Sequence, residues 1–146
     1  MKVKIYRGTK EIGGSCIELT ADNGTILWVE VGAPLDDTNP DISYALNKVD
    51  ALLISHPHQD HYGLMEKVGT KVPIYIGEVA LDFINATKIF INEPQLNGNY
   101  HTIKPWQTFT ICDTFVVKSF LTDHSTPEAF AFLIEADGRE FIIVVI

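Results

Sequence analysis

The feature that most constrains this chain is a short apolar run that ends in a cluster of metal-ligating side chains. Residues 51–55 read Ala-Leu-Leu-Ile-Ser, and His56, His58, Asp60 and His61 occupy four of the next six positions. A short continuous apolar run is typical of a strand covered on both faces. The sequence therefore predicts a buried strand that ends in a histidine-rich loop.

The side chains of this cluster are those that proteins use to hold divalent metals such as Zn²⁺. In a loop after a strand, His56 and His58 can point the same way and hold one ion, while Asp60 and His61 turn toward a second. Two ions about 3.5–4 Å apart can share a hydroxide and stabilise both the attacking and the leaving oxygen. The pattern therefore favours metal-assisted hydrolysis.

Histidines also occur in polar surface loops, and this alternative applies differently to each candidate. It accounts for one or two histidines, but not for four ligand-type side chains with this spacing after a buried strand. His124, taken alone, is typical of a solvated loop, and His101 is interpreted as a surface residue. Cys16 and Cys112 have no CxxC spacing and are expected to be buried thiols in strands.

Turn signals and alternating patterns divide the chain into strands and helices. Asn23-Gly24 and Asp137-Gly138 are strong hairpin turns, because these residue types accept the positive φ angles of tight turns. An antiparallel opening, strand–helix pairs and closing hairpins indicate a single α/β or α+β sandwich domain over residues 1–146. Strands are expected at residues 3–6, 15–20, 25–31, 50–55, 72–76, 108–111, 114–120, 129–136 and 139–146, helices at 41–48, 62–68 and 78–91, and irregular structure at 92–107.

Composition narrows the class of protein further. With 46% hydrophobic and 21% charged residues, the chain has an ordinary globular composition. No apolar run approaches the ~20 residues that span a bilayer, and the N-terminus lacks the apolar core of a signal peptide. We therefore expect a cytoplasmic protein without a membrane partner. The net charge of −8 argues against a broad basic surface for nucleic acid on these residues.

The histidine cluster also resembles a known family. The spacing His56-x-His58-x-Asp60-His61 matches the HxHxDH signature of the metallo-β-lactamase fold. Residues 10–16, Lys-Glu-Ile-Gly-Gly-Ser-Cys, resemble the opening of its ribonuclease J-like (β-CASP) branch, and Asp123-His124-Ser125 before an apolar strand resembles its next metal motif. The resemblance implies an αββα sandwich of the α/β class, of which this chain is the N-terminal half.

The resemblance also implies roles for individual residues. His124 is expected to join His56 and His58 on the first metal, while Asp60 and His61 bind the second and Asp60 orients the attacking water. Glu30 occupies the position where the family has Asp. It is expected to brace the ligand loop without binding the metal itself. The expected cofactor is zinc, two ions in the parent enzyme and one or two here, with Mn²⁺ as an alternative.

The end of the chain departs from the family. Aligned from Gly138, the aspartate that bridges the two metals falls on Ile146, whose side chain cannot ligate a metal. The resemblance then places the other sheet, the last histidine of the second site and the RNA-gripping β-CASP domain beyond this chain. We therefore expect a truncated N-terminal fragment of a larger enzyme.

Two hypotheses about function follow. The first is zinc-dependent hydrolysis of RNA phosphodiesters by an activated hydroxide, which the ribonuclease J-like resemblance implies for the parent enzyme. The second is a non-catalytic metal-binding or structural half-domain that holds one ion through His56, His58 and His124. In that case the exposed apolar strand near Ile146 is expected to promote self-association.

Overall fold

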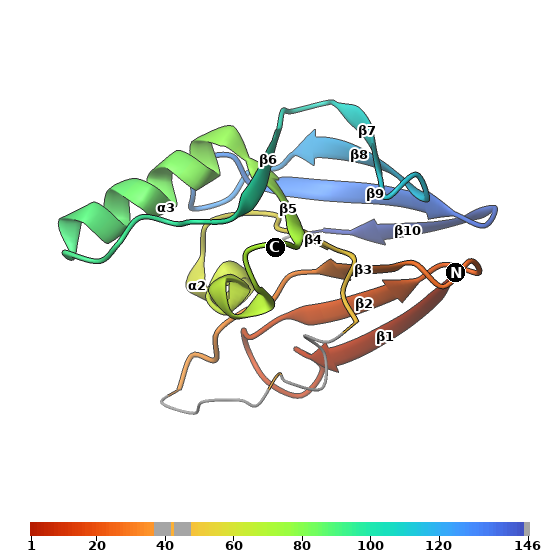
Figure 1. Ribbon diagram of the computed structural model, residues 1–146, viewed down its shortest axis with the longest axis horizontal. Coiled ribbons are helices and arrows are strands. Elements are labelled where there is room, and N and C mark those ends of the chain that lie inside the picture. The colour runs from red at the N-terminus through yellow and green to blue at the C-terminus, as the bar shows by residue number, and fades with distance from the viewer. Residues whose placement is uncertain (37–41, 43–47, 145–146) are drawn as a thin grey trace.

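The computed structural model describes residues 1–36, 42 and 48–144, and it contains two β-sheets and a helical layer (Figure 1). The first sheet has six strands in the order β1-β2-β3-β4-β5-β6, and the second has four in the order β10-β9-β8-β7. The first sheet contains β1 (Lys2–Arg7), β2 (Cys16–Thr20), β3 (Ile26–Val29), β4 (Ala51–Leu53), β5 (Pro73–Gly77) and β6 (Asn99–Ile103). The second contains β7 (Thr108–Ile111), β8 (Phe115–Leu121), β9 (Phe130–Ala136) and β10 (Arg139–Ile143). The helices are α2 (Gln59–Tyr62), the 3-10 helix η1 (Met65–Val68) and α3 (Glu78–Phe90).

The first sheet changes from antiparallel to parallel pairing at β3. Strands β1, β2 and β3 pair antiparallel, and Gly24, with φ of 89°, forms the tight turn between β2 and β3. From β3 to β6 all neighbours pair parallel. Parallel strands present their carboxyl ends at one edge of a sheet, so the loop after β4 emerges beside the end of β5.

The second sheet is antiparallel throughout. Both of its tight turns use two successive residues with positive φ, Cys112 and Asp113 between β7 and β8, and Asp137 and Gly138 between β9 and β10. This is the geometry of the favoured two-residue hairpin, whose twist matches that of its strands. The prediction of two closing hairpins is confirmed.

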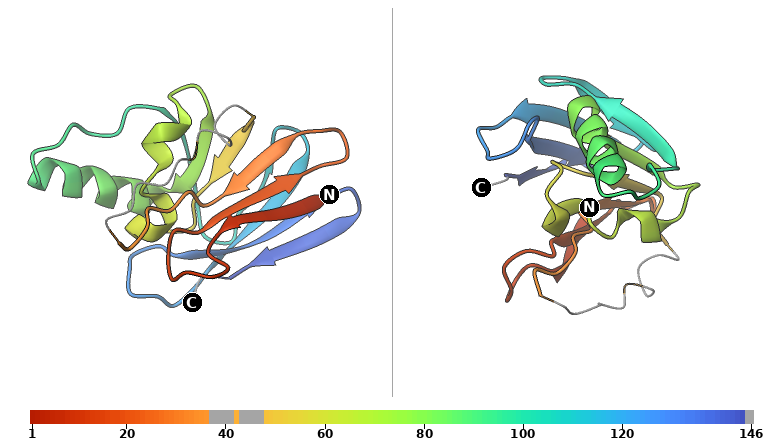
Figure 2. Two further views of the ribbon diagram at one scale, coloured as in Figure 1. Left: turned by 90° about the horizontal axis from the view of Figure 1, so that it is seen from below. Right: turned by 90° about the vertical axis from the view of Figure 1, so that its left-hand side faces the viewer.

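The two sheets enclose one core. Leu19, Leu27 and Leu53 of the first sheet pack against Phe115 and Phe130 of the second, and all five side chains are fully buried. Along β8, buried and exposed residues alternate, so one face of the second sheet is apolar and must be covered. The expectation that the other sheet lies wholly beyond this chain is therefore wrong, because β7–β10 supply a second layer (Figures 1 and 2).

A second core lies between the first sheet and the helices. Leu52 and Ile54 point to this side with Trp28, and they pack with Met65 of η1 and Ile84 of α3. The helix α3 extends away from the strands beyond this contact (Figure 1). The predicted α/β sandwich is confirmed, with helices against the outer face of the first sheet.

Two local predictions are wrong. Residues 62–68 do not form one helix, because α2 ends at Tyr62 and the amide of Leu64 instead donates to the carbonyl of Val31 at 2.9 Å. Residues 92–107 are not all irregular, because β6 adds to the edge of β5 and its backbone finds partners there. The sequence around β6 is rich in turn residues, so it did not predict a strand that forms through its pairing with β5.

Three further expectations concern particular positions. Cys16 is buried in β2 as predicted, but Cys112 is exposed, because it occupies the tip of a hairpin rather than a strand interior. Residues 41 and 43–47 of the helix expected at 41–48, and the bridging position at Ile146, lie outside the described residues. In the part of the chain that the structure describes, no helix has the length and apolar character needed to cross a bilayer.

Removing a ring from the core between the sheets tests this packing. Phe115 is fully buried and Val116, its neighbour in β8, is 40% exposed. We expect Phe115→Ala to lower the free energy of unfolding by about 3–5 kcal/mol, and Val116→Ala by less than about 1 kcal/mol. Urea denaturation followed by circular dichroism measures both, and equal effects would contradict the two-layer core.

Candidate metal centre

The histidine-rich loop begins inside the protein. Strand β4 is followed by Ile54, Ser55 and His56, and these three residues are fully buried. The amide of Ile54 still donates to the carbonyl of Tyr75 in β5 at 2.8 Å, so the backbone leaves the sheet only after this point. His56 is thus presented at the carboxyl end of the parallel strands from a rigid support.

Three imidazoles converge at this edge. His56 Nε2 lies 3.1 Å from His58 Nδ1, and His124 Nε2 lies 3.3 Å from the same nitrogen. One ligand atom from each ring can be chosen so that all three lie within 4.8 Å of one another. The structure therefore brings His124 to the pair that the sequence predicted, although 66 positions separate it from His58.

The spacing of these nitrogens fits a metal ion. Zinc–nitrogen bonds of about 2.0–2.1 Å in a tetrahedral site place neighbouring nitrogens roughly 3.3 Å apart. Ser55 Oγ lies 2.7 Å from His56 Nδ1. In the tautomer that carries its hydrogen on Nδ1, His56 donates a hydrogen bond to this hydroxyl and turns an unprotonated Nε2 toward the other rings. Such an outer hydrogen bond fixes the ring and leaves the inner nitrogen free to bind. The donor set fits a zinc ion with one open position.

Burial and mutual repulsion keep two of these rings neutral. Burial, followed by the nearby rings of His61, His58 and His124, lowers the pKa of His56 to about 3. Burial and the neighbouring His124 also lower the pKa of His58 below its ordinary value. A neutral imidazole is the form that ligates a metal, so no proton has to be removed from His56 at neutral pH.

Asp60 and His61 lie beside the three-histidine cluster, on the short helix α2. His61 Nε2 is 3.6 Å from Asp60 Oδ2, and His61 Nδ1 is 3.5 Å from Glu30 Oε2. Within residues 1–36, 42 and 48–144, no third metal-ligating side chain completes a group with Asp60 and His61. The expected second ion stays a prediction.

Close backbone approach holds α2 in place. The carbonyl of Asp60 accepts a hydrogen bond from the amide of Ser15 at 3.0 Å. This carbonyl passes so close to Gly32 that a Cβ there would overlap it, so only glycine fits. The glycine-containing segments before β2 and after β3 thus position the aspartate and histidine of α2.

Glu30 contacts both parts of the site. It is 1% exposed, and its Oε1 accepts a hydrogen bond from the amide of Ser55 at 3.1 Å. Burial lowers the pKa of His61, but the carboxylates of Glu30 and Asp60 outweigh it and hold that pKa above its ordinary value. This placement suits the bracing role predicted for Glu30, which stays a prediction until it is tested.

Sequence reasoning missed one residue that contacts a predicted ligand, and one residue of the loop that carries His124. Ser55 orients His56, and its place directly before the first histidine of the cluster was the available signal. Glu128, four positions after His124, accepts a hydrogen bond from the amide of Val79 at 2.6 Å. No local sequence pattern predicts this contact, because the amide that Glu128 accepts from lies on a helix elsewhere in the chain. His101 is exposed and stacks on Tyr75.

Comparison with known proteins places this geometry in a family. A family model described as the beta-lactamase superfamily domain matches residues 33–143. The chain belongs to this family. The resemblance to the metallo-β-lactamase fold is thereby confirmed at the level of the superfamily, while the ribonuclease J-like branch is a finer assignment that this match does not decide.

Two curated relatives match part of the chain. Transcription termination factor FttA of Methanosarcina mazei is 34% identical over 85 residues, which is 51% of this chain and 13% of that protein. Anti-Pycsar protein Apyc1 of Bacillus phage BSP38 is 26% identical over 106 residues, which is 71% of this chain and 41% of that protein. The matched region thus spans well under two thirds of each relative.

Solved structures share the fold. The short form of human tRNase Z superposes with a TM-score of 0.66 at 17% identity, covering 99% of this chain and 69% of that one. Zn²⁺-bound PqqB from Methylobacterium extorquens gives a TM-score of 0.64 at 19% identity, covering 88% and 51%. At these identities the similarity establishes the architecture of the beta-lactamase superfamily and leaves the reaction open.

The opposite pKa shifts of two neighbouring histidines are testable in the metal-free chain. An ordinary histidine is half protonated near pH 6.5. At that pH we expect His56, whose pKa is about 3, to be neutral, and His61, whose pKa is raised, to be more than half protonated. Imidazole proton shifts in NMR spectra, assigned with single His→Ala variants, measure both. Similar titration of the two rings near pH 6.5 would contradict this electrostatic picture.

Proposed function

We propose that this chain carries the metal site of a metal-dependent hydrolase whose substrate is an RNA phosphodiester. The observation that carries the proposal is the convergence of His56, His58 and His124, with nitrogen separations of 3.1 and 3.3 Å that suit one tetrahedral ion. Three protein ligands leave a fourth position for water or substrate, as catalytic rather than structural zinc sites do.

The residues of the site have distinct parts in this proposal. Imidazole ligands favour Zn²⁺, with Mn²⁺ as a weaker alternative because it prefers oxygen ligands. When bound, the ion supplies a Lewis acid and a nucleophile available at neutral pH. Asp60 lies beside the cluster with its side chain 24% exposed, so its carboxylate can accept a proton from a water molecule and orient it. Asp60 and His61 are also the proposed ligands of a second ion.

The substrate class is supported by relatives rather than by the site itself. One relative is named a transcription termination factor, and one solved structure with the same fold is a tRNase. The segment Lys10–Cys16, which resembles the ribonuclease J-like opening, points the same way. We propose on these grounds that the chain acts within a ribonuclease J-like enzyme on RNA.

A second candidate function is a non-catalytic metal-binding half-domain. It is favoured by one observation, that Asp60 and His61 have no third ligand among the described side chains. Strand β10 forms one edge of the second sheet, and Ile142 within it and Val144 just after it are 64% and 57% exposed. An apolar edge of this kind can pair with the same edge of a second copy, and we attach self-association to this candidate.

Zinc titration tests the proposed ligands. We expect the wild-type chain to bind zinc at the three-histidine cluster, and His124→Ala to weaken binding by at least about 100-fold, since loss of an outer-sphere partner alone costs roughly 10–100-fold. His101→Ala is the matched control, because His101 is exposed on β6, and it should bind as wild type. Competition with a chromophoric chelator measures the affinities. Equal affinity for all three proteins would remove the cluster as the site.

Turnover separates the two candidate functions. If the chain is a hydrolase, the zinc-loaded protein should cleave an RNA oligonucleotide or an activated phosphodiester, and Asp60→Asn should lower kcat by about 10²–10⁴-fold. The variant should retain zinc on the three histidines. A chain that binds zinc fully and shows no cleavage of either substrate would leave the non-catalytic candidate in place.

A further inference from the structure

A single carboxylate joins the His124 loop to the helical layer. Glu128 Oε2 accepts hydrogen bonds from the amides of Val79 at 2.6 Å and Ala80 at 3.3 Å, both in the first turn of α3. These partners lie 49 and 48 positions away in the sequence. The contact therefore ties the loop after β8 to a helix on the far side of the first sheet.

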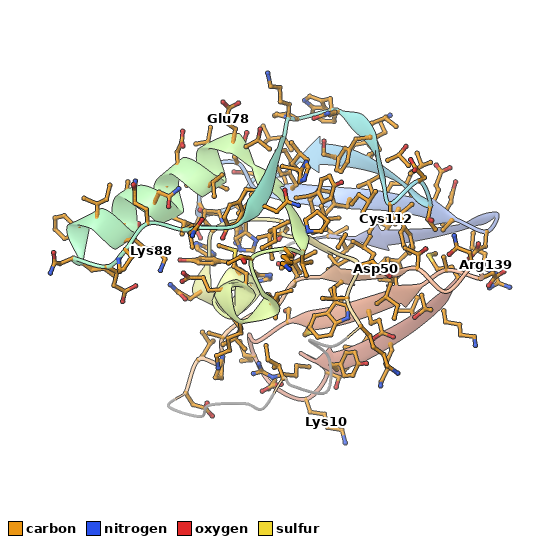
Figure 3. The ribbon with its side chains drawn as sticks, in the orientation of Figure 1. Lys10, Asp50, Glu78, Lys88, Cys112 and Arg139 are labelled. Atoms are coloured by element: carbon orange, nitrogen blue, oxygen red, sulfur yellow. The ribbon has the colours of Figure 1, made fainter. Side chains whose placement is uncertain are left out.

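The start of α3 is built to receive this carboxylate. Gly77 occupies the N-cap position and offers no side chain to the free amides of the first turn. A Cβ at Gly77 would overlap the carboxylate of Glu128, so the absence of a side chain there is what allows the approach. A carboxylate also interacts favourably with the positive end of the helix dipole. Figure 3 shows Glu78 at the end of α3 near the sheets and Lys88 at the other end.

The loop itself is held at defined points. Its base is closed by the amide of Thr122, which donates to the carbonyl of Ala129 at 2.9 Å. The amide of Phe130 donates to the carbonyl of Ser55 at 3.1 Å, directly before His56. Glu128 has φ of 54°, a conformation that costs energy for any residue except glycine and persists where surrounding contacts impose it.

These contacts have a consequence for the metal centre. His56 and His58 follow strand β4 at the carboxyl end of the first sheet, whereas His124 lies in the loop between β8 and β9 of the second sheet. We propose that Glu128 is a positioning residue for His124: by capping α3, it sets the distance between the His124 loop and the other two imidazoles. The inference rests on the proposed metal site and adds a residue to it that no sequence motif marks.

Zinc affinity is the measurement that separates positioning from simple helix stabilisation. We expect Glu128→Ala to weaken zinc binding by about 10–100-fold, as loss of an outer-sphere contact does. Glu128→Gln keeps an oxygen that accepts from both amides and should fall between Glu128→Ala and wild type. Ala86→Gly is the matched control, because it destabilises the same helix at an exposed position without touching the loop, and its zinc affinity should equal that of wild type.

The Co²⁺-substituted protein provides a second readout. The intensity of the visible Co²⁺ bands reports the ligand geometry, so Glu128→Ala should change the spectrum in the direction that His124→Ala does, while Ala86→Gly should leave it unchanged. If Glu128→Ala does not fold, as judged by circular dichroism, Glu128→Gln and Gly77→Ala apply the same test.

The outcomes separate this inference from the proposed function. If His124→Ala loses zinc but Glu128→Ala binds as wild type, the metal site stands and the role of Glu128 is refuted. If Ala86→Gly weakens binding as much as Glu128→Ala does, the effect is general helix stability and the role is again refuted. If wild type itself binds no zinc, both the site and the inference fail.

Discussion

The site depends on Ser55, a fully buried residue whose polar groups are all engaged. Its amide donates to Glu30 Oε1, its hydroxyl contacts His56 Nδ1, and its carbonyl accepts from the amide of Phe130. The last of these bonds joins the start of the His56 loop to Phe130, where the His124 loop ends and β9 begins. Because buried polar groups are costly unless paired, these bonds orient His56 and tie the residue before it to the end of the His124 loop.

The surrounding structure shows why a rigid support is needed. Three imidazoles whose nitrogens lie 3.1 and 3.3 Å apart have poor hydrogen-bonding options among themselves, since each nitrogen pair needs one proton or one cation between its members. Strand β4, the hydrogen bond from the Phe130 amide to the Ser55 carbonyl and the cap that Glu128 places on α3 hold them together nonetheless. Such preorganisation means that little rearrangement is required when an ion enters.

The sequence predicted what is local and missed what depends on tertiary pairing. The buried strand at residues 51–53 and the predicted ligands His56, His58, Asp60 and His61 lie in one short segment, so their spacing alone carried the prediction. His124 was predicted only through the family resemblance, because the fold rather than the chain brings it to the cluster. Strand β6 was missed because it exists through pairing with β5.

For the architecture too, local features were predictable from the sequence and features that depend on tertiary contacts were not. Hairpin turns at Asn23-Gly24 and Asp137-Gly138 were readable, since the need for positive φ restricts the residue type. The second sheet was expected from a region beyond the chain, yet β7–β10 form it by burying the apolar face that their alternating pattern creates. Glu128 was not predictable, because the amides it caps are 48 and 49 positions away.

The ligands of the bound ion can be identified by X-ray absorption at the zinc edge. We expect a first shell with three imidazole nitrogens at about 2.0–2.1 Å and one further light atom, and a shell with one imidazole fewer in His124→Ala. A first shell made mainly of oxygen atoms, or one that His124→Ala leaves unchanged, would contradict the assignment of His56, His58 and His124 as the ligands.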